Sequence, residues 1–233
     1  MTVLFVTGTG TGIGKTVTTA ALAAAALADG RSVAVLKPAQ TGVGPDEPGD
    51  AAEVARLAGA VTTEELARFP EPLAPATAAA RAGRTPVGPQ QVADAAEKLA
   101  ASHDLVLVEG AGGLLVRFDA DGRTLADAAR LAGAPVLVVT EAGLGTLNAT
   151  ALTALALRTH GLRCAGVVIG SWPAAPDLAS RCNLADLPES ADAPLLGLVP
   201  EGAGGLPPGA FRSAAPGWLA PALGGSGTFR LPG

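Results

Sequence analysis

The sequence predicts an α/β protein with a mostly parallel sheet flanked by helices. Two observations lead to this class. Short apolar runs alternate with longer, Ala-rich stretches along the 233 residues, which is the pattern of βαβ units. A glycine-rich loop joins the first apolar run to the first Ala-rich stretch. We expect right-handed crossovers between successive strands.

Six apolar runs are interpreted as strands. They are continuous and rich in β-branched residues, as expected of strands that are covered on both faces. The predicted strands are Val3–Val6, Val33–Leu36, Leu105–Val108, Val136–Val139, Ala165–Ile169 and Leu195–Val199. The predicted helices between them are Lys15–Ala28, Asp50–Ala58, Pro89–Ala101, Thr124–Leu131 and Leu147–Thr159.

The chain is interpreted as a single domain over residues 1–223, because no linker separates two cores. The Pro- and Ala-rich segment Phe69–Pro89 is expected to be a surface loop. Gly and Pro make up 14 of the last 33 residues, so the only helix expected there lies around Ser213–Leu223. Residues 224–233 are expected to form a flexible tail.

The composition argues against several classes of function. A net charge of −5 and a pI of about 5.0 lack the basic footprint of proteins that bind nucleic acid or anionic membranes. The two cysteines, Cys164 and Cys182, are too few for a disulfide scaffold or a Cys-only zinc site. The first apolar run is too short for a signal peptide or a membrane span, so we expect a cytoplasmic protein.

The glycine-rich loop is interpreted as a phosphate-binding loop. It reads Gly-Thr-Gly-Thr-Gly-Ile-Gly-Lys-Thr from Gly8 to Thr16, after the first strand and before the first helix. Glycines let the backbone turn its N–H groups toward phosphates, and the helix N-terminus adds partial positive charge. Lys15 is expected to reach the β- and γ-phosphates, and the Thr16 hydroxyl to hold Mg²⁺.

The spacing of this loop departs from the usual phosphate-loop pattern. Four residues normally separate the first glycine from Gly14, which would place that glycine at Thr9, whereas Gly8 lies one residue earlier. The alternative is a turn that only joins strand to helix. The strand, the Gly-Lys-Thr sequence and the helix together favour a phosphate-loop nucleoside triphosphatase type of fold, which does not by itself define a reaction.

Polar residues follow three other predicted strands, where ligands gather in parallel sheets. Lys37 directly follows the second strand, and its charge could stabilise an anion beside the phosphate loop. Glu109 ends the third strand, where phosphate-loop enzymes place a carboxylate linked to Mg²⁺. The alternatives are a surface lysine and a solvated carboxylate before a glycine-rich turn.

The third of these sites, after the predicted strand Val136–Val139, and the residue Asp50 both stay open on the residues alone. The segment Gly143–Asn148 opens a helix, and its N–H groups could hold a carboxylate, or Thr146 could be an ordinary N-cap. Asp50 could be a second carboxylate for Mg²⁺, although its spacing favours an N-cap for the helix that follows.

With these residues in view, the sequence resembles the ATP-dependent dethiobiotin synthase family up to about residue 202. Any one of the matching motifs is weak, but their presence in this order is specific. The motifs are Val6-Thr7-Gly8-Thr9 with Gly14-Lys15-Thr16, Lys37-Pro38 with Thr41-Gly42, Val108-Glu109-Gly110-Ala111-Gly112-Gly113, and Gly143-Leu144-Gly145-Thr146-Leu147-Asn148. The lengthened phosphate loop is also a habit of this family.

The resemblance implies a Mg²⁺-dependent ligase of biotin synthesis that converts 7,8-diaminononanoate, CO₂ and ATP (or another NTP) to a cyclic urea. It also implies a homodimer with a shared active site. By position, Lys37 and Lys15 match catalytic lysines, and Thr16, Asp50 and Glu109 match residues that hold the metal; for Asp50 this outweighs the N-cap. The implied nucleotide-binding residues are Gly12, Ile13, Gly14, Lys15, Thr16, Val17, Asp50, Glu109, Gly110, Ala111, Gly112, Gly170, Ser171, Pro200, Glu201 and Gly202. The implied substrate-binding residues are Thr41, Gly143, Leu144, Gly145, Thr146, Leu147 and Asn148, the last six contributed by the partner chain.

Two departures from the family pattern concern the nucleotide. Many members carry an acidic residue where this chain has Gly12, and many place an Asn that reads adenine where this chain has Gly170. We therefore expect weak discrimination among nucleoside triphosphates. The rival function is a switch or partition ATPase of the deviant phosphate-loop class. Such ATPases usually carry an extra Lys early in the loop, where this chain has Gly10.

Overall fold

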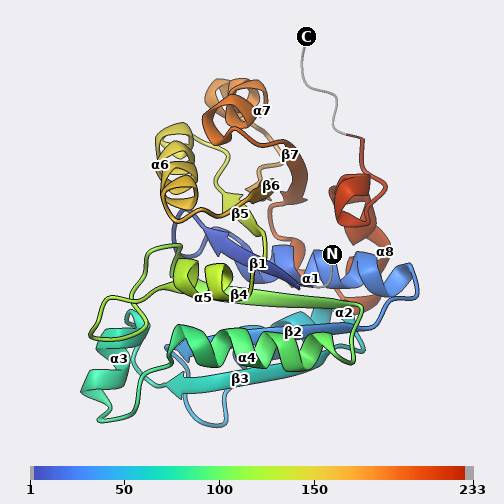
Figure 1. Ribbon diagram of the computed structural model, residues 1–233. Coiled ribbons are helices and arrows are strands. Elements are labelled where there is room, and N and C mark those ends of the chain that lie inside the picture. Colours follow the sequence, from blue (N-terminus) through green and yellow to red (C-terminus); the bar gives the residue numbers. More distant parts are fainter. Residues whose placement is uncertain (1–2, 229–233) are drawn as a thin grey trace.

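The structure is a computed structural model and describes residues 3–228. A seven-stranded sheet in the order β3-β2-β4-β1-β5-β6-β7 runs through its centre (Figure 1). Each pair of neighbouring strands in it is parallel. β1 lies between β4 and β5, so the chain builds one half of the sheet before β5 begins the other half. A crevice for ligands forms beyond the carboxyl ends of the strands at such a switch point.

All six predicted strands are present, and each ends one to five residues later than predicted. The strands are β1 Val3–Gly8, β2 Val33–Thr41, β3 Thr62–Phe69, β4 Leu105–Gly113, β5 Val136–Thr140, β6 Cys164–Trp172 and β7 Leu195–Pro200. The extensions carry Gly, Lys and Pro, which do not encode a strand by composition. Parallel pairing extends them, as at Lys37 with Glu65 and at Gly8 with Gly113.

The predicted helices match the observed ones closely. The α-helices are α1 Lys15–Ala28, α2 Asp50–Ala58, α3 Pro75–Arg81, α4 Pro89–Ala100, α5 Leu125–Leu131, α6 Thr146–Thr159, α7 Leu178–Ala191 and α8 Pro208–Ala214. Three short 3₁₀ helices follow β7 and α8: η1 Ala203–Gly205, η2 Ala215–Trp218 and η3 Pro221–Leu223. No helix within residues 3–228 has both the length and the apolar character needed to cross a bilayer.

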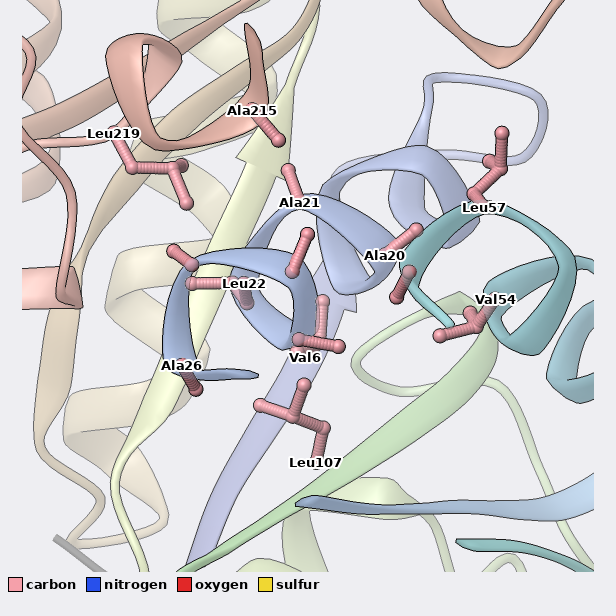
Figure 2. Packing of buried hydrophobic residues seen from close by; sticks show 14 of the residues in the cluster. Val6, Ala20, Ala21, Leu22, Ala26, Val54, Leu57, Leu107, Ala215 and Leu219 are labelled. Carbon is pink, nitrogen blue, oxygen red and sulfur yellow. The ribbon is translucent and has the colours of Figure 1, made fainter. Parts of the chain in front are cut away.

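Two layers of helices cover the sheet. Along β1, Leu4 and Val6 face the apolar cluster of α1, α2 and α8, whereas Phe5 faces the cluster of α3, α4 and α5. Figure 2 shows Val6 and Leu107 of the sheet pointing toward α1. The facing side chains of α1 are mostly alanines and are fully buried. These small side chains let α1 lie close to β1, which places the loop between them directly at the edge of the sheet.

Four expectations about secondary structure are wrong. β3 was not predicted, because its sequence Thr-Thr-Glu-Glu-Leu-Ala-Arg-Phe is polar, as suits a strand at the edge of a sheet. The segment Phe69–Pro89 is not only a loop, since it contains α3, whose Pro75 fits the first turn of a helix. The Pro-containing helix α7 was also missed. The tail helix was placed too late: the regular helix is α8, and the predicted region holds η2 and η3.

The chain beyond Leu223 folds back onto the segment around η2. The backbone N–H of Ser226 donates to Pro216 at 2.8 Å, and that of Gly227 donates to Leu219 at 2.8 Å. Residues 229–233, the rest of the tail expected to be flexible, lie outside the described residues.

Candidate active site

The glycine-rich loop has the backbone that phosphate binding requires. Gly12 and Gly14 have φ angles of +75° and +92°, which L side chains rarely adopt. A Cβ atom on Gly14 would lie 2.1 Å from the carbonyl oxygen of Gly170 on β6. Both glycines are therefore needed: Gly12 for the turn and Gly14 for the turn and for close packing on the sheet. α1 begins at Lys15, directly after this turn.

Lys15 lies buried at the base of the loop. Its Nζ donates to the carbonyl oxygen of Gly10 at 2.8 Å, so the ammonium group lies under the turn that phosphates would enter. Burial lowers the pKa of Lys15 below the usual 10.5; the carboxylates of Glu109 and Asp50 oppose the shift, and the charge of Lys37 adds to it.

Lys37, in the middle of β2, is buried beside two carboxylates. Its Nζ donates to Glu109 Oε1 at 2.9 Å and to the carbonyl of Gly110 at 3.3 Å, and it forms an ion pair with Asp50. Burial alone would lower the pKa of Lys37, but the charges of Glu109 and Asp50 outweigh it and raise that pKa above its usual value. Lys37 is therefore a fixed positive charge in the cleft.

The donor set around Glu109 fits a hard divalent cation. Glu109 Oε1 accepts from Thr16 Oγ1 and from Lys37 Nζ, each at 2.9 Å, whereas Glu109 Oε2 is buried without a hydrogen-bond partner among the described residues. A buried carboxylate oxygen without a partner is costly. Mg²⁺ is typically held by one or two carboxylates together with substrate phosphates. Thr16, Asp50 and Glu109 supply oxygens of this kind at one place.

Gln40 orients Asp50, a contact that the sequence analysis missed. The buried Gln40 Oε1 accepts from the backbone N–H of Asp50 at 2.8 Å, while its Nε2 donates to the carbonyl of Thr41 at 3.2 Å. Gly49 is the N-cap of α2 and Asp50 is its first residue, so the N-cap interpretation of Asp50 is wrong. The carboxylate is instead turned toward Lys37. In the sequence, this contact could have been suspected only because Gln40 lies beside Thr41 at the end of a strand.

A cleft joins these groups to a neighbouring hollow. The cleft has a volume of about 390 Å³ and is lined by the loop, β2, Asp50 and the end of β4. A second hollow of about 450 Å³ lies beside it, between the end of β4 and the segment Pro72–Pro75. Thr11, Thr41, Ala111 and Gly112 line both hollows. A small substrate in the second hollow would therefore lie next to the phosphate loop.

A third hollow lies on the other side of the loop. It has a volume of about 460 Å³ and shares Gly12 with the first cleft. Its wall includes Ile13, Gly143, Ser171 and Glu201, which the sequence analysis had assigned, and it also includes Glu141, Ala142, Pro173 and Ser180, which it had not. Most of this wall comes from the carboxyl ends of β5, β6 and β7 and the residues just after them, so this hollow offers room for the nucleoside part of a nucleotide.

Gly170 does not line the hollows described above. A Cβ atom built on it would lie 2.1 Å from the carbonyl oxygen of Ile13 and 2.6 Å from Val139 Cγ1. The residue is therefore a contact between β6 and the phosphate loop, and the backbone of the loop occupies the space that a side chain would need.

The segment Gly143–Asn148 surrounds the start of α6. Gly145 is the N-cap, Thr146 begins the helix, and no side chain caps it, so Thr146 is not the N-cap. The Thr146 hydroxyl donates to the carbonyl of Glu141 at 2.7 Å instead. Gly143 reaches the third hollow, whereas Leu144, Gly145, Leu147 and Asn148 do not line the hollows described here. Leu144 is 87% exposed.

The structure thus brings most of the predicted residues to one edge of the sheet. The first cleft gathers Gly12, Gly14, Lys15, Thr16, Val17, Lys37, Thr41, Asp50, Glu109, Ala111 and Gly112. Besides Gly170 and the residues Leu144–Asn148, three more predicted residues, Gly110, Pro200 and Gly202, do not line the hollows described above. The carbonyl of Gly110 nevertheless accepts from Lys37. Besides Gln40, the sequence analysis missed Thr11 and Ala39, which line the same cleft.

Fold and cleft together define a phosphate-loop nucleoside triphosphatase. A family profile described as an AAA domain matches residues 2–204. The ATP-dependent dethiobiotin synthetase BioD of Streptomyces coelicolor is 74% identical over 97% of this chain and 95% of its own length. The protein of the same description from Mycobacteroides abscessus is 52% identical over 94% of this chain and 98% of its own length. The chain belongs to the ATP-dependent dethiobiotin synthetase family.

Solved structures share the fold at low sequence identity. The cell division protein MinD of Aquifex aeolicus has a TM-score of 0.59 and 14% identity over 99% of this chain and 100% of its own. The cell division ATPase MinD of Pyrococcus furiosus has a TM-score of 0.57 and 22% identity over 92% and 96%. At such identities the likeness shows the fold alone. It does not favour a partition ATPase over the family defined by the sequence relatives.

Proposed function

We propose that the protein carries out the ATP-dependent conversion of 7,8-diaminononanoate and CO₂ to dethiobiotin, in biotin synthesis. One observation carries this proposal beyond family membership. A buried, fixed ammonium group, that of Lys37, lies between two carboxylates in the cleft of the phosphate loop, and this cleft adjoins a second hollow. A group of that kind suits a reaction in which negative charge develops between a nucleotide and a small substrate.

The proposed reaction has three steps, and each is balanced in atoms and charge. One amine of the substrate adds to CO₂ and loses a proton, giving a carbamate. A carbamate oxygen attacks the γ-phosphorus of ATP, the bond to the β-phosphate oxygen breaks, and ADP leaves with a carbamic–phosphoric anhydride formed. The second amine then attacks the carbamate carbon, the C–O bond to phosphate breaks, and inorganic phosphate and a proton leave as the cyclic urea closes.

The side chains of the cleft have separate tasks in these steps. Lys37 holds the anionic carbamate and the developing charge on the transferred phosphoryl group, and Lys15 holds the β- and γ-phosphates. Thr41 lines both the nucleotide cleft and the second hollow, where its hydroxyl can orient the diamine. Because the chemistry needs mainly position and charge, these residues need not gain or lose protons.

Mg²⁺ would be held by Thr16, Asp50 and Glu109. The unpartnered Glu109 Oε2 and the hydroxyl of Thr16 beside it support this assignment. When bound, the ion would neutralise charge on the phosphates. The chain's own contribution is orientation, since Gln40 fixes the first residue of α2 and Lys37 fixes both carboxylates.

A homodimer would complete the site through α6. The exposed leucines Leu144, Leu152 and Leu155 lie on or just before this helix, at exposures of 87, 58 and 52%. Leu152 and Leu155 are three residues apart and share one face. A second copy that covered this face would bring Gly143–Asn148, with the first N–H groups of α6, to the carboxylate of the partner's substrate.

The dimer has a direct test. Replacing Leu152 and Leu155 by Glu should convert the dimer to a monomer in light scattering and raise the KM for the diamine. Leu131→Glu, at a leucine 45% exposed on α5, is the matched control. A double variant that stays dimeric would place the interface elsewhere.

The site would discriminate only weakly among the bases of nucleoside triphosphates. In this chain the position that carries an adenine-reading Asn in many relatives is Gly170, whose surroundings leave no room for a side chain. We therefore expect CTP and GTP to support turnover at rates comparable to ATP. A thousandfold preference for ATP at equal concentration would contradict this expectation.

The function itself is tested by phosphate release from the pure protein with MgATP and bicarbonate, with and without 7,8-diaminononanoate. We expect release that depends on the diamine and a cyclic urea detected by mass spectrometry. Release that ignores the diamine would instead indicate an ATPase of the switch or partition class.

A further inference from the structure

Four threonine hydroxyls form a buried cluster where β5 ends. Thr140, the last residue of β5, lies at its centre and is fully buried. Its Oγ1 is 2.6 Å from Thr146 Oγ1, 2.9 Å from Thr150 Oγ1 and 3.3 Å from Thr9 Oγ1. Thr9 belongs to the phosphate loop, and Thr146 and Thr150 belong to the first turns of α6. One hydroxyl therefore joins two segments that the sequence analysis treated separately.

The direction of these hydrogen bonds follows from the number of protons. A hydroxyl has one proton to donate and can accept two bonds. The Thr146 hydroxyl donates its one hydrogen bond to the carbonyl of Glu141, which can only accept. Thr140 must therefore donate to Thr146, and it can only accept from Thr9 and Thr150. The Thr140 hydroxyl thus makes every bond open to it: it accepts from Thr9 of the phosphate loop and from Thr150 of α6, and it donates to Thr146 of α6.

Both ends of this cluster are fixed a second time. The backbone N–H of Thr9 donates to the carbonyl of Val139 at 2.9 Å. On the other side, the buried Asn183 of α7 donates to the carbonyls of Ala142 and Gly143 at 2.7 and 3.1 Å. With Thr146 on Glu141, three successive carbonyls of this loop are held by side chains of the protein. The loop is thereby fixed where it turns into α6.

We propose that Thr140 is a positioning residue that fixes the phosphate loop relative to the start of α6. It would hold the site of the nucleotide at a set distance from the site of the substrate carboxylate. The second half of this statement rests on the proposed function, in which Gly143–Asn148 binds that carboxylate. In the proposed dimer this segment serves the partner's substrate, so Thr140 would link the two active sites.

The test compares the KM values of Thr140→Val with those of variants that break one side only. Thr140→Val keeps the shape and removes every bond of the hydroxyl. We expect it to raise the KM for MgATP and for the diamine by about tenfold each, with kcat within about twofold, because buried partners are left unpaired. Thr9→Val should raise only the KM for MgATP, and Asn183→Asp only that for the diamine. Thr140→Ser, which keeps the hydroxyl, should restore both.

The control is Thr153→Val, which removes a hydroxyl bond of 2.9 Å within α6 to the carbonyl of Ala149. Both KM values should stay at wild-type level there. A Thr140→Val protein with a lower melting temperature but unchanged KM values would overturn the proposal, since that is what a merely structural hydroxyl predicts. A change in one KM alone would also overturn it.

Two further results keep the test decisive. If Thr140→Val does not fold, Thr9→Val decides the nucleotide half, and an unchanged KM for MgATP in that variant overturns the proposal. If the wild-type protein releases no phosphate in response to the diamine, the proposed function fails by itself. The dissociation constant of MgADP in the same variants then still tests the link between Thr140 and the phosphate loop.

Discussion

The two halves of the sheet build their parts of the site by different means. On the β2 and β4 side, buried charges face each other, with Lys37 between Asp50 and Glu109. On the β5 and β6 side, the contacts are uncharged: hydroxyls around Thr140 and the close approach of Gly170 to the phosphate loop. In the proposed reaction, the first half supplies the charge that the chemistry needs, and the second half sets where the backbone lies.

This difference predicts how variants fail. Removing a charge from the first half should lower turnover while the nucleotide still binds. Disturbing the second half should weaken binding while the chemistry of the bound complex survives. The following changes test that division, from the largest expected effect to the smallest.

Lys37→Ala should have the largest effect. Loss of one preorganised charge donor lowers kcat by about 10²–10³-fold in comparable sites. MgATP should still bind, because Lys15 and the loop are untouched. The substitution also leaves Glu109 buried without its cation, so the melting temperature should fall. Steady-state kinetics and nucleotide binding by calorimetry check both expectations.

Lys98→Ala is the matched control, since Lys98 is an exposed lysine on α4. It should change neither turnover nor stability. A Lys37→Ala protein that binds nucleotide and turns over near the wild-type rate would remove Lys37 from the mechanism.

Gly170→Asn should weaken nucleotide binding, although the family pattern suggests an improvement. An Asn there would be expected to restore adenine recognition. In this chain its Cβ would overlap the carbonyl of Ile13, so the phosphate loop must move. Overpacking of this kind costs about 1–3 kcal/mol, which corresponds to roughly 5- to 150-fold weaker nucleotide binding if the loop bears it.

Gly161→Asn controls for the residue type. Gly161 has a φ of +68° and nothing within 4 Å of a built Cβ, and Asn tolerates that conformation. A Gly170→Asn protein that binds MgATP more tightly than wild type would show that the loop adapts and that the base is read there.

The sequence predicted the charged half of the site better than the uncharged half. Lys37 and Glu109 stand out because a charge directly after an apolar strand has no structural reason. Thr140 and Asn183 carry no such signal, since an uncharged polar side chain does not stand out beside an apolar strand as a charge does, and the partners of these two residues lie up to 131 positions away. Gly170 was assigned to the nucleotide and noted for the Asn it replaces, whereas its close contact with the loop is visible only in the folded structure.

The elements of the fold were predicted where composition alone decides them. The buried strands and α1 were predicted because their residues are apolar wherever the sheet covers them. β3 and α7 were not, since edge position and packing against β6 decide them more than composition. The ends of the predicted strands matter for function. Gly, Gln and Thr residues that extend β2 and β4 beyond their predicted ends line part of the cleft.

The smallest expected effect is on the pH dependence of nucleotide binding, and it separates the two lysines. The pKa of Lys37 is raised, so its charge persists as the pH rises. Burial lowers the pKa of Lys15, so Lys15 loses its proton at a lower pH than a free lysine does. Above that lowered pKa each pH unit reduces the charged fraction about tenfold. The affinity for MgADP should therefore begin to fall in the pH range below 10.5, where an ordinary lysine still keeps its proton.

Binding of MgADP is the right measurement because it leaves out the amines of the substrate, which titrate in the same range. Lys15→Arg keeps the charge at every pH in this window, because a guanidinium does not lose its proton there. That variant can bind more weakly throughout, but its affinity should not depend on pH. If wild type and Lys15→Arg lose affinity in parallel, the group that titrates is not Lys15, and the charged half of the site would have to contain a second ionisation.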